Sequence, residues 1–374
     1  MSTVDEIGIG MVGTAFMGAA HSQAWRTVNR VFDLPVRARM SAICGRDEER
    51  TAAAADRLGW SAYETDWQAL IARDDVQLVD VCTPGDSHAE IAIAALRAGK
   101  HVLCEKPLAN TVAEAAAMAS AATEAGTVAM TGFTYRRVPA LALMADLVAA
   151  GRIGDVRHVR AAYLQDWLVD PAAPLTWRLQ AEHAGSGALG DLGAHIVDAT
   201  RYLTGLEFTE VSALTETFVT ERPTGGGTGA VTVDDAALFL ARLSGGAVGT
   251  FEATRYATGR KNGLRIELNG TRGTLAFDLE RLNELEFHDG TLRSTEAGLT
   301  RILVTEPDHP YVAAWWPPGH LLGYEHAFTH QARDLLAAIA GGTSVSASFD
   351  DGLAVQRVLA AVASSAASGS WTSV

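Results

Sequence analysis

The segment Ile7-Gly8-Ile9-Gly10-Met11-Val12-Gly13-Thr14-Ala15-Phe16-Met17-Gly18 joins a short apolar run to a turn bounded by glycines. The apolar run predicts a buried strand over residues 7–13, and the residues after the turn predict a helix to about residue 28. Strand, G-x-G-x-x-G turn and helix in this order form a dinucleotide-binding fingerprint, here with Ala15 at the middle position. Gly13 permits the tight turn, and Gly18 permits close packing of the helix on the strand.

The alternation of strand and helix signals continues for the next hundred residues. Strands are predicted over 39–44 and 78–82, before Lys106 and over 127–131, and helices over 48–58, 67–72, 89–98 and 112–125. This pattern is typical of a doubly wound parallel sheet with about six β/α units. We therefore predict an α/β fold in which residues 1–132 form an NAD(P)-binding Rossmann domain.

Glu105-Lys106-Pro107 stands where one of these apolar strands ends. Doubly wound sheets bind ligands outside the carboxyl ends of their strands, and a residue before proline is held in extended geometry. Thr83-Pro84 and His88 follow the strand at 78–82 and belong to the same edge. We expect this edge to bind the dinucleotide, through Gly13, Ala15, Phe16, Met17, Thr83, Pro84, His88, Glu105 and Lys106.

The end of the predicted second strand bears on the choice of cofactor. NAD-binding folds usually place an acidic residue there to hold the ribose hydroxyls, whereas this chain has Gly45-Arg46-Asp47. Arg46 could hold a 2′-phosphate or stack on adenine, and Asp47 could serve the ribose. The alternative is a solvated pair of charges at the start of a helix. NAD and NADP both remain open as cofactors.

The second part of the chain has a different pattern. Extended, alternating or β-branched runs recur after residue 133 with few helices between them, and they predict a large, mainly antiparallel open sheet in a second α/β domain, residues 133–374. The glycine-rich run at 225–229 is expected to be a loop with no strand after it. Two helices, over 325–340 and 353–365, and a final strand at 370–374 are predicted to close the chain.

A glycine-rich turn at residues 184–190 leads into a predicted helix over 189–203 that carries Asp191 and His195. These residues are four apart, so they project from the same face of the helix. A histidine titrates near neutrality, and a carboxylate one turn away can orient it or bind a substrate hydroxyl. The alternative is an aspartate favoured by the helix dipole beside a core histidine. No third ligand at a suitable spacing suggests a metal site.

Composition excludes several classes of function. The 374 residues are 48% hydrophobic and 20% charged, with a net charge of −14 and no basic cluster, which argues against nucleic acid or an anionic membrane as a partner. No apolar run reaches the roughly 18 residues that span a bilayer. The acidic start of the chain is unlike a signal peptide. Cys44, Cys82 and Cys104 fall in predicted buried strand ends, which indicates a cytoplasmic protein with reduced thiols.

The motifs together resemble those of the Gfo/Idh/MocA oxidoreductases, the family of glucose–fructose oxidoreductase and inositol dehydrogenase. The resemblance is carried by Gly13-x-Ala15-Phe16-Met17-Gly18, Thr83-Pro84 with His88, Glu105-Lys106-Pro107 and Asp191-x-x-x-His195, in order, and covers essentially the whole chain. It implies NAD or NADP as cofactor, a sugar or cyclitol substrate, and a homodimer or homotetramer formed through the open sheet. It also implies that Lys106, Asp191 and His195 are catalytic.

Further site residues are implied by the same resemblance. Trp177-Arg178 matches a tryptophan–arginine pair near the cofactor. Segments 163–167, 184–191, 252–255 and 259–262 resemble one branch of the family that acts on an anhydrosugar, which would make Tyr135 and Gln165 substrate contacts beside Lys106, Asp191 and His195. Residues 315–326 depart from that branch and are a further candidate for lining the pocket.

The expected activity is oxidation of a secondary hydroxyl of a pyranose-type sugar, anhydrosugar or cyclitol by hydride transfer to the nicotinamide. His195 would take the hydroxyl proton, Lys106 would stand beside the developing alkoxide, and Asp191 would hold a neighbouring hydroxyl. Lysine is also a candidate for the proton acceptor. The alternatives are an NADPH-dependent reductase of a keto- or anhydro-sugar, which Arg46 favours, and a non-catalytic regulator that binds NAD(P) or a sugar.

Overall fold

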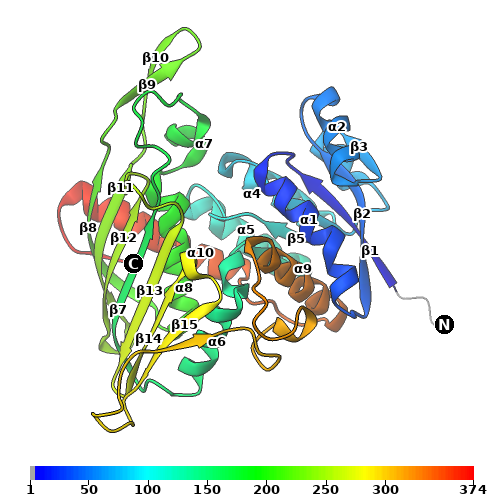
Figure 1. The fold of residues 1–374 in the computed structure, drawn as a ribbon. Coiled ribbons are helices and arrows are strands. Elements are labelled where there is room, and N and C mark those ends of the chain that lie inside the picture. Colours follow the sequence, from blue (N-terminus) through cyan, green and yellow to red (C-terminus); the bar gives the residue numbers. More distant parts are fainter. Residues whose placement is uncertain (1–4) are drawn as a thin grey trace. The chain divides into compact units, whose positions relative to one another are not determined.

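The computed structural model describes residues 5–374, and the chain divides into two compact units (Figure 1). Unit 1 comprises Met1–Arg137 and Gly323–Leu353, and unit 2 comprises Val138–Leu322 and Ala354–Val374. Segment Gly323–Leu353 belongs to unit 1 because its helix α9 (Tyr324–Gly341) packs against α1 (Phe16–Val31). The domain division at residue 132 stays a prediction, and the compact units divide the chain differently at this returning segment.

Unit 1 is built on a parallel sheet of six strands in the order β3-β2-β1-β4-β5-β6. The strands are β1 (Asp5–Val12), β2 (Val36–Cys44), β3 (Ala62–Glu64), β4 (Leu78–Val81), β5 (His101–Cys104) and β6 (Ala129–Thr131). The strand order reverses between β1 and β4, and this reversal creates the crevice in which doubly wound sheets bind ligands. The predicted Rossmann sheet is confirmed.

The helices of unit 1 begin and end where the sequence provides caps. They are α1, α2 (Glu48–Leu58), α3 (Trp67–Ala72), α4 (His88–Arg97), α5 (Val112–Ala125) and α9. Asp47, Asp66 and Thr111 accept backbone N–H bonds at the starts of α2, α3 and α5, while Gly59 and Gly126 end α2 and α5 in the left-handed conformation. β4 is buried along its whole length, as expected of a central parallel strand.

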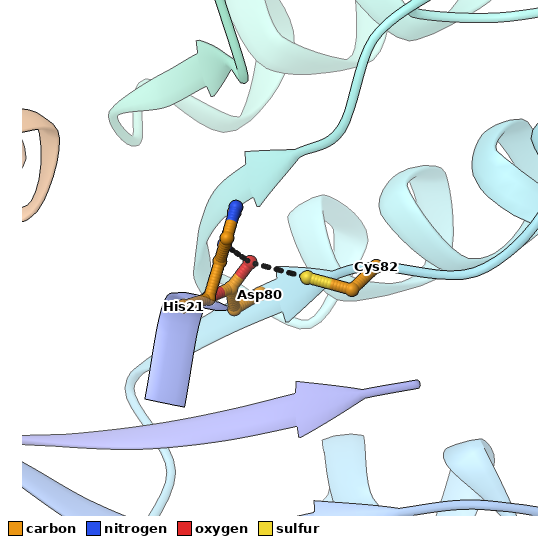
Figure 2. Close-up of side chains that lie close together, drawn as sticks. All are labelled: His21, Asp80 and Cys82. Carbon is orange, nitrogen blue, oxygen red and sulfur yellow. Dashed lines mark hydrogen bonds and ion pairs between the residues drawn. The ribbon is translucent and has the colours of Figure 1, made fainter. Parts of the chain in front are cut away.

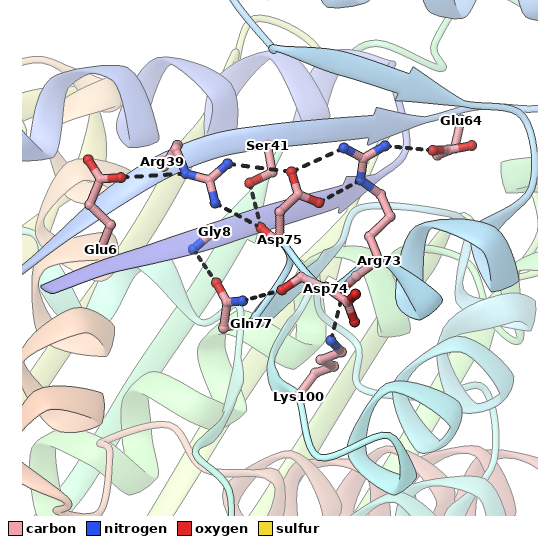
Figure 3. Close-up of polar contacts among 10 residues, drawn as sticks. All are labelled: Glu6, Gly8, Arg39, Ser41, Glu64, Arg73, Asp74, Asp75, Gln77 and Lys100. Carbon is pink, nitrogen blue, oxygen red and sulfur yellow. Dashed lines mark hydrogen bonds and ion pairs between the residues drawn. The ribbon is translucent and has the colours of Figure 1, made fainter.

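A polar network closes unit 1 near the amino ends of its central strands (Figure 3). Arg73 donates to Glu64 at 2.8 Å and to Asp75 at 2.8 and 3.1 Å, and these bonds hold the pKa of Asp75 below its ordinary value. Lys100, directly before β5, donates to the carbonyl oxygens of Arg73 and Val76 at 3.1 and 2.6 Å. The network therefore ties the loop before β4 to the start of β5.

Unit 2 is built on a mixed sheet of nine strands in the order β16-β15-β14-β13-β7-β12-β11-β8-β17, in which only β7 and β12 pair in parallel. The strands are β7 (Val156–Leu164), β8 (Phe208–Glu216), β11 (Ala236–Leu243), β12 (Val248–Thr254), β13 (Gly263–Gly270), β14 (Gly273–Asp278), β15 (Glu284–Asp289), β16 (Thr300–Leu303) and β17 (Thr372–Ser373). The predicted large, mainly antiparallel sheet is confirmed.

Helices α6 (Pro139–Ala149) and α8 (Ala194–Thr204) pack on one face of this sheet, and α10 (Phe349–Ser368) is tied to β8 by the hydrogen bond from Ala213 N to Ser365 Oγ. Burial alternates along β11, and every second side chain, including Leu238 and Leu240, is exposed. The sheet is thus covered on one face and open on the other. No helix within residues 5–374 is long and apolar enough to cross a membrane.

The glycine-rich run at 225–229 is not a plain loop. Strands β9 (Glu221–Thr224) and β10 (Gly227–Ala230) pair antiparallel around it, so the prediction that no strand follows the glycines is wrong. Glycine and threonine give no alternating apolar signal, and the hairpin is anchored from elsewhere. The buried Arg222 of β9 donates to the carbonyl oxygens of Asp170 and Leu168 at 2.8 and 2.7 Å and to the Tyr256 hydroxyl at 2.6 Å.

Candidate active site

The turn after β1 has the geometry that the fingerprint predicts. Gly13 has a φ of 120°, and a Cβ atom there would lie 2.6 Å from the carbonyl oxygen of Cys82. A Cβ on Gly18 would lie 2.1 Å from the carbonyl oxygen of Gly13. Both glycines are therefore required by close backbone approach, and they place the start of α1 at the crevice between β1 and β4.

The first turn of α1 suits a bound pyrophosphate. Ala15 is the N-cap residue, and neither a side-chain cap nor an acidic residue occurs in this first turn of the described helix. The free backbone N–H groups and the positive end of the helix dipole therefore face the crevice without a protein anion. Phe16 is 65% exposed and Met17 is half-buried at this turn. These residues fit the dinucleotide that the fold binds, and their individual contacts with it stay predictions.

At the end of β2, the structure separates the roles of Arg46 and Asp47. The Asp47 carboxylate accepts the backbone N–H of Arg50 at 2.9 Å and caps α2. Its side chain therefore serves the start of the helix, which supports the alternative that the sequence left open for Asp47. Arg46 is exposed after Gly45 at the carboxyl end of the strand.

His88 links two of the predicted cofactor turns. The residue is 1% exposed, and its Nε2 lies 2.9 Å from the carbonyl oxygen of Thr83 while its Nδ1 lies 3.1 Å from that of Pro107. The ring thus holds the Thr83-Pro84 turn after β4 beside the Lys106-Pro107 turn after β5. Direct contact of His88 with the cofactor stays a prediction, whereas its role in positioning these turns follows from the contacts.

Lys106 lies two residues beyond the end of β5, at the edge where the sequence placed it. The side chain is half-buried, and the peptide bond to Pro107 is cis. The preceding Glu105 is 5% exposed, and its Oε2 accepts the backbone N–H of Lys106 at 3.2 Å. Tyr135, also in unit 1, is buried in the short helix η2 (Thr134–Arg137), with its ring centroid 6.5 Å from that of Tyr324.

In unit 2, Asp191 and His195 lie on a continuous helical segment, as predicted, but its first turn is wider than expected. Residues Leu189–Gly193 form a π-helical turn, η4, in which Ala194 N donates to the carbonyl oxygen of Leu189, and α8 follows. Turns of this kind occur frequently at functional sites. Asp191 and His195 are both half-buried.

The start of this helical segment is held by Asp234, which sequence reasoning missed. The Asp234 carboxylate accepts the N–H of Gly187 and of Leu189, each at 2.7 Å. A Cβ on Gly187 would lie 1.7 Å from the carbonyl oxygen of Asp234, so this close approach requires glycine. The only signal in the sequence is a pair of acidic residues before β11, which does not reveal a partner almost fifty positions earlier.

A polar cluster at the carboxyl end of β7 lies beside His195. The rings of Tyr163 and His195 are 5.6 Å apart and nearly perpendicular. The Tyr163 hydroxyl and the Gln165 side-chain amide both donate to Asn262 Oδ1, at 2.7 and 2.8 Å, and Trp167 Nε1 donates to Gln165 Oε1 at 3.0 Å. Gln165 is therefore held in a fixed orientation by Asn262, which also binds Tyr163, the ring neighbour of His195. Tyr163 and Asn262 join the predicted residues of this cluster.

The predicted site residues thus form one group in each unit. Unit 1 carries Lys106, Tyr135 and the dinucleotide turns, while unit 2 carries the group around His195. Trp177 and Arg178 lie in the short helix η3 (Trp177–Leu179) of unit 2, with the guanidinium 4.4 Å from the centre of the indole ring. The joint action of Lys106, Asp191 and His195 on one substrate stays a prediction, as does the part of residues 315–326 in lining the pocket.

Comparison with known proteins assigns both parts of the chain. Residues 7–133 match the family model described as "Oxidoreductase family, NAD-binding Rossmann fold", and residues 141–276 match that of the "GFO/IDH/MocA C-terminal domain". Levoglucosan dehydrogenase from Pseudarthrobacter phenanthrenivorans is 42% identical over 99% of both chains.

Solved structures agree with this assignment over the full length of the chain. An oxidoreductase domain protein from Kribbella flavida is 65% identical, with a TM-score of 0.98 over 99% of both chains. The complex of levoglucosan dehydrogenase with NADH and levoglucosan is 42% identical, with a TM-score of 0.96 over 99% of both chains. The chain therefore belongs to the GFO/IDH/MocA family of oxidoreductases with an NAD-binding Rossmann domain.

Proposed function

We propose that the protein is an NAD(P)-dependent dehydrogenase that oxidises a secondary hydroxyl of a pyranose-type sugar, an anhydrosugar or a cyclitol. The observation that supports this most strongly is the position of Lys106, at the carboxyl edge of an NAD-binding sheet and fixed beside the dinucleotide turns. The full-length similarity to levoglucosan dehydrogenase makes an anhydrosugar the first substrate to try.

The side chains have distinct tasks in this reaction. When NAD is bound, its nicotinamide supplies the hydride acceptor. His195 takes the hydroxyl proton, the Lys106 ammonium stabilises the negative charge that develops on the oxygen, and Asp191 accepts a hydrogen bond from a neighbouring hydroxyl. Gln165, held by Asn262 and Trp167, presents a fixed amide to the sugar. In the alternative, Lys106 takes the proton, and comparison of kcat–pH profiles for His195→Asn and wild type distinguishes the two assignments.

The test is a panel of sugars and polyols with NAD and NADP, followed by nicotinamide absorbance. It includes levoglucosan, glucose, the inositols, and C- and O-glycosides. Turnover of at least one compound in one of these classes is expected. Stoichiometric binding of cofactor without turnover of any of them contradicts the proposal and favours a non-catalytic regulator on the same scaffold.

A second candidate function is reduction of a keto- or anhydro-sugar by NADPH, which the exposed Arg46 at the end of β2 favours. Arg46→Ala is expected to weaken NADP binding about 10- to 100-fold, because a charge-assisted bond to a 2′-phosphate contributes about 1.5–3 kcal/mol, and to leave NAD binding little changed. Fluorescence titration with NADH and NADPH measures both affinities.

Arg50→Ala is the matched control for this experiment, since Arg50 is an exposed arginine on the first turn of α2. Its loss should leave the ratio of the two affinities unchanged. If wild type and Arg46→Ala each bind NADH and NADPH with equal affinity, Arg46 does not determine which cofactor is bound.

We also propose that the protein is a homodimer or homotetramer that buries the open face of the nine-stranded sheet. This face has a groove of about 760 Å³ lined by β7, β8 and β11–β14 together with residues 281–286. Its apolar strip comprises Leu214, Leu238 and Leu240, which are 60%, 42% and 50% exposed. Apolar patches of this kind mark sites of protein association.

Leu240→Arg is expected to convert the oligomer to monomers, because it places a charge in the centre of the apolar strip. Size-exclusion chromatography with light scattering measures the mass. Leu292→Arg is the control, since Leu292 is 45% exposed in the turn between β15 and β16. An unchanged mass for Leu240→Arg excludes this face as the interface.

A cytoplasmic location is supported by the cysteines. Cys44, Cys82 and Cys104 are free and buried. Burial raises the pKa of Cys44 to about 12 and raises the pKa values of Cys82 and Cys104 well above the ordinary value, so all three remain thiols at neutral pH. Buried unpaired thiols are typical of proteins of a reducing compartment.

A further inference from the structure

A buried histidine of α1 lies between two carboxylates of the Rossmann sheet. His21 Nδ1 lies 3.0 Å from each carboxylate oxygen of Asp80 on β4 (Figure 2), and its Nε2 lies 3.1 Å from Glu105 Oε1 beyond the end of β5. His21, Asp80 and Glu105 are 2%, 0% and 5% exposed. The chain therefore buries two acidic groups around one imidazole ring, and one of them, Glu105, directly precedes Lys106 in the sequence.

The hydrogen bonds determine the protonation of this ring. A carboxylate only accepts hydrogen bonds, and a neutral imidazole has a single N–H, so a neutral His21 would leave a ring lone pair facing one of the carboxylates. Both contacts are satisfied when His21 is an imidazolium ion. Burial, the largest single effect, lowers the pKa of His21, but the charge and hydrogen bond of Asp80, with a smaller contribution from Cys82, together raise this pKa well above its ordinary value.

The surroundings of the ring contain few other polar groups. Trp25, one turn further along α1, donates to Asp80 Oδ2 at 2.7 Å, and the Cys82 thiol lies 3.5 Å from Asp80 Oδ1. From α9, Phe328 packs on the imidazole with ring centroids 5.4 Å apart. The charged groups that face His21 are thus Asp80 from β4 and Glu105 from the turn after β5.

A metal centre is the other arrangement that these side chains suggest, since donor atoms of His21, Asp80 and Cys82 lie within 4.8 Å of one another. However, the Asp80 oxygens already accept hydrogen bonds from His21, Trp25 and Cys82. Burial also raises the pKa of Cys82 well above its ordinary value, so its sulfur is a protonated thiol. The cluster is therefore a satisfied hydrogen-bond network.

This network ends at the backbone of Lys106. Glu105 uses Oε1 for His21 and Oε2 for the Lys106 N–H, at 3.1 and 3.2 Å. Gly132 leaves room for the carboxylate, because a Cβ there would lie 2.6 Å from Glu105 Oε1. The Glu105 side chain is thus fixed at both oxygens, and without His21 it would be a buried carboxylate with no counter-charge on the Oε1 side.

We propose that His21 is a positioning residue for Lys106, which it holds through Glu105. The imidazolium fixes the Glu105 carboxylate, and the carboxylate fixes the backbone N–H of Lys106. The backbone from which the Lys106 side chain extends is thereby held in place. The ring thereby sets the position of the ammonium relative to the dinucleotide turns. This inference rests on the proposed role of Lys106 in catalysis.

Two substitutions of His21 separate its two hydrogen bonds. The amide of asparagine takes the place of Nδ1, and the amide of glutamine takes the place of Nε2. His21→Asn therefore keeps the bond to Asp80 and loses the bond to Glu105, whereas His21→Gln keeps the bond to Glu105 and loses the bond to Asp80. Both variants lose the positive charge of the imidazolium. Each therefore controls for the effect of that loss on the stability of the other.

His21→Asn is expected to lower kcat about 10- to 100-fold, since small displacements of a catalytic group cost this much, and to leave KM and the Kd of the cofactor little changed. His21→Gln should retain most of the wild-type kcat. The melting temperatures of both variants are expected to fall by similar amounts. Equal losses of kcat in the two variants, or no loss in His21→Asn, overturn the proposal.

The pH dependence of stability adds a second readout. A pKa raised by folding gives a stabilisation that is complete below the unfolded value of about 6.5 and is lost as the pH rises through the folded value. The difference in melting temperature between wild type and His21→Asn should therefore shrink as the pH is raised from about 6.5. A difference that grows with pH contradicts a buried imidazolium.

NMR of the full-length protein labelled with ¹⁵N-histidine tests the network independently of turnover. Both ring nitrogens of His21, assigned by loss of the signals in His21→Gln, are expected at imidazolium shifts at pH 7.5. A neutral tautomer overturns the proposal even if the protein proves to be a sugar dehydrogenase. Imidazolium shifts in a protein that turns over no sugar would instead place the failure in the proposed function.

Discussion

Lys106→Met is expected to lower kcat by roughly 10²- to 10³-fold, the usual cost of removing a group that stabilises charge in the transition state. Methionine keeps most of the length and volume of the side chain and removes the ammonium ion. The negative charge that develops on the oxygen as the hydroxyl proton is removed would then have no cation beside it. Steady-state kinetics with the best substrate of the panel measure kcat and KM, and fluorescence titration with NADH should show a Kd close to that of wild type.

Lys100→Met is the control for this prediction. Lys100 lies before β5 and Lys106 lies after it. The Lys100 ammonium donates to the carbonyl oxygen of Arg73 (Figure 3) and to that of Val76. Loss of the Lys100 ammonium should lower the melting temperature and leave kcat unchanged, because its hydrogen bonds lie near the amino ends of the strands, at the opposite edge of the sheet from Lys106. A Lys106→Met variant with unchanged kcat would remove Lys106 from the chemistry.

The residues that predicted the fold belong to short patterns that are visible locally in the sequence. Gly13 and Gly18 belong to one such pattern, although they are required by different contacts: a Cβ on Gly18 would meet Gly13 itself, whereas a Cβ on Gly13 would meet Cys82, directly after the neighbouring strand β4. The caps of α2 and α5 likewise involve residues three positions apart. Lys106 was found because parallel strands bring their carboxyl ends to one edge of the sheet.

What the sequence did not reveal depends on pairs that are far apart along the chain. His21 meets Asp80 and Glu105 across 59 and 84 residues, and Gly187 meets Asp234 across 47. Neither contact leaves a periodic pattern, since His21 is one of several polar residues on α1 and Asp234 is one of two adjacent aspartates before β11. The return of α9 to unit 1 has the same cause, because its apolar stripe does not specify the helix against which it packs.

Asp234→Ala is expected to destabilise unit 2 and to loosen the segment that carries Asp191 and His195. The substitution leaves the N–H groups of Gly187 and Leu189 without their acceptor, and both residues are buried. A buried donor without a partner costs about 1–3 kcal/mol, so the free energy of unfolding should fall by roughly 3 kcal/mol. Thermal and denaturant unfolding measure this loss.

A matched pair of variants shows whether the effect is specific to this turn. Asp234→Asn keeps one carbonyl acceptor and should lie between wild type and Asp234→Ala in stability. Asp170→Ala removes a carboxylate that accepts the N–H of Ala172 at 2.8 Å on an exposed turn, and it should change the stability little. Similar losses in the free energy of unfolding for Asp170→Ala and Asp234→Ala would mean that the buried turn contributes no more to stability than an exposed turn.

Hydrogen exchange separates a local role of Asp234 from a general loss of stability. In Asp234→Ala, the amides of residues 187–195 should exchange faster than in wild type. Their increase in rate should exceed that of the amides in the distant strands β14 and β15, since the wide turn η4 depends on the N–H bonds that the carboxylate accepts. Loss of this turn would displace Asp191 and His195 together, and kcat should fall about tenfold or more with it. Uniform acceleration across unit 2, with kcat per folded molecule unchanged, would show that Asp234 supports the fold without positioning the catalytic helix.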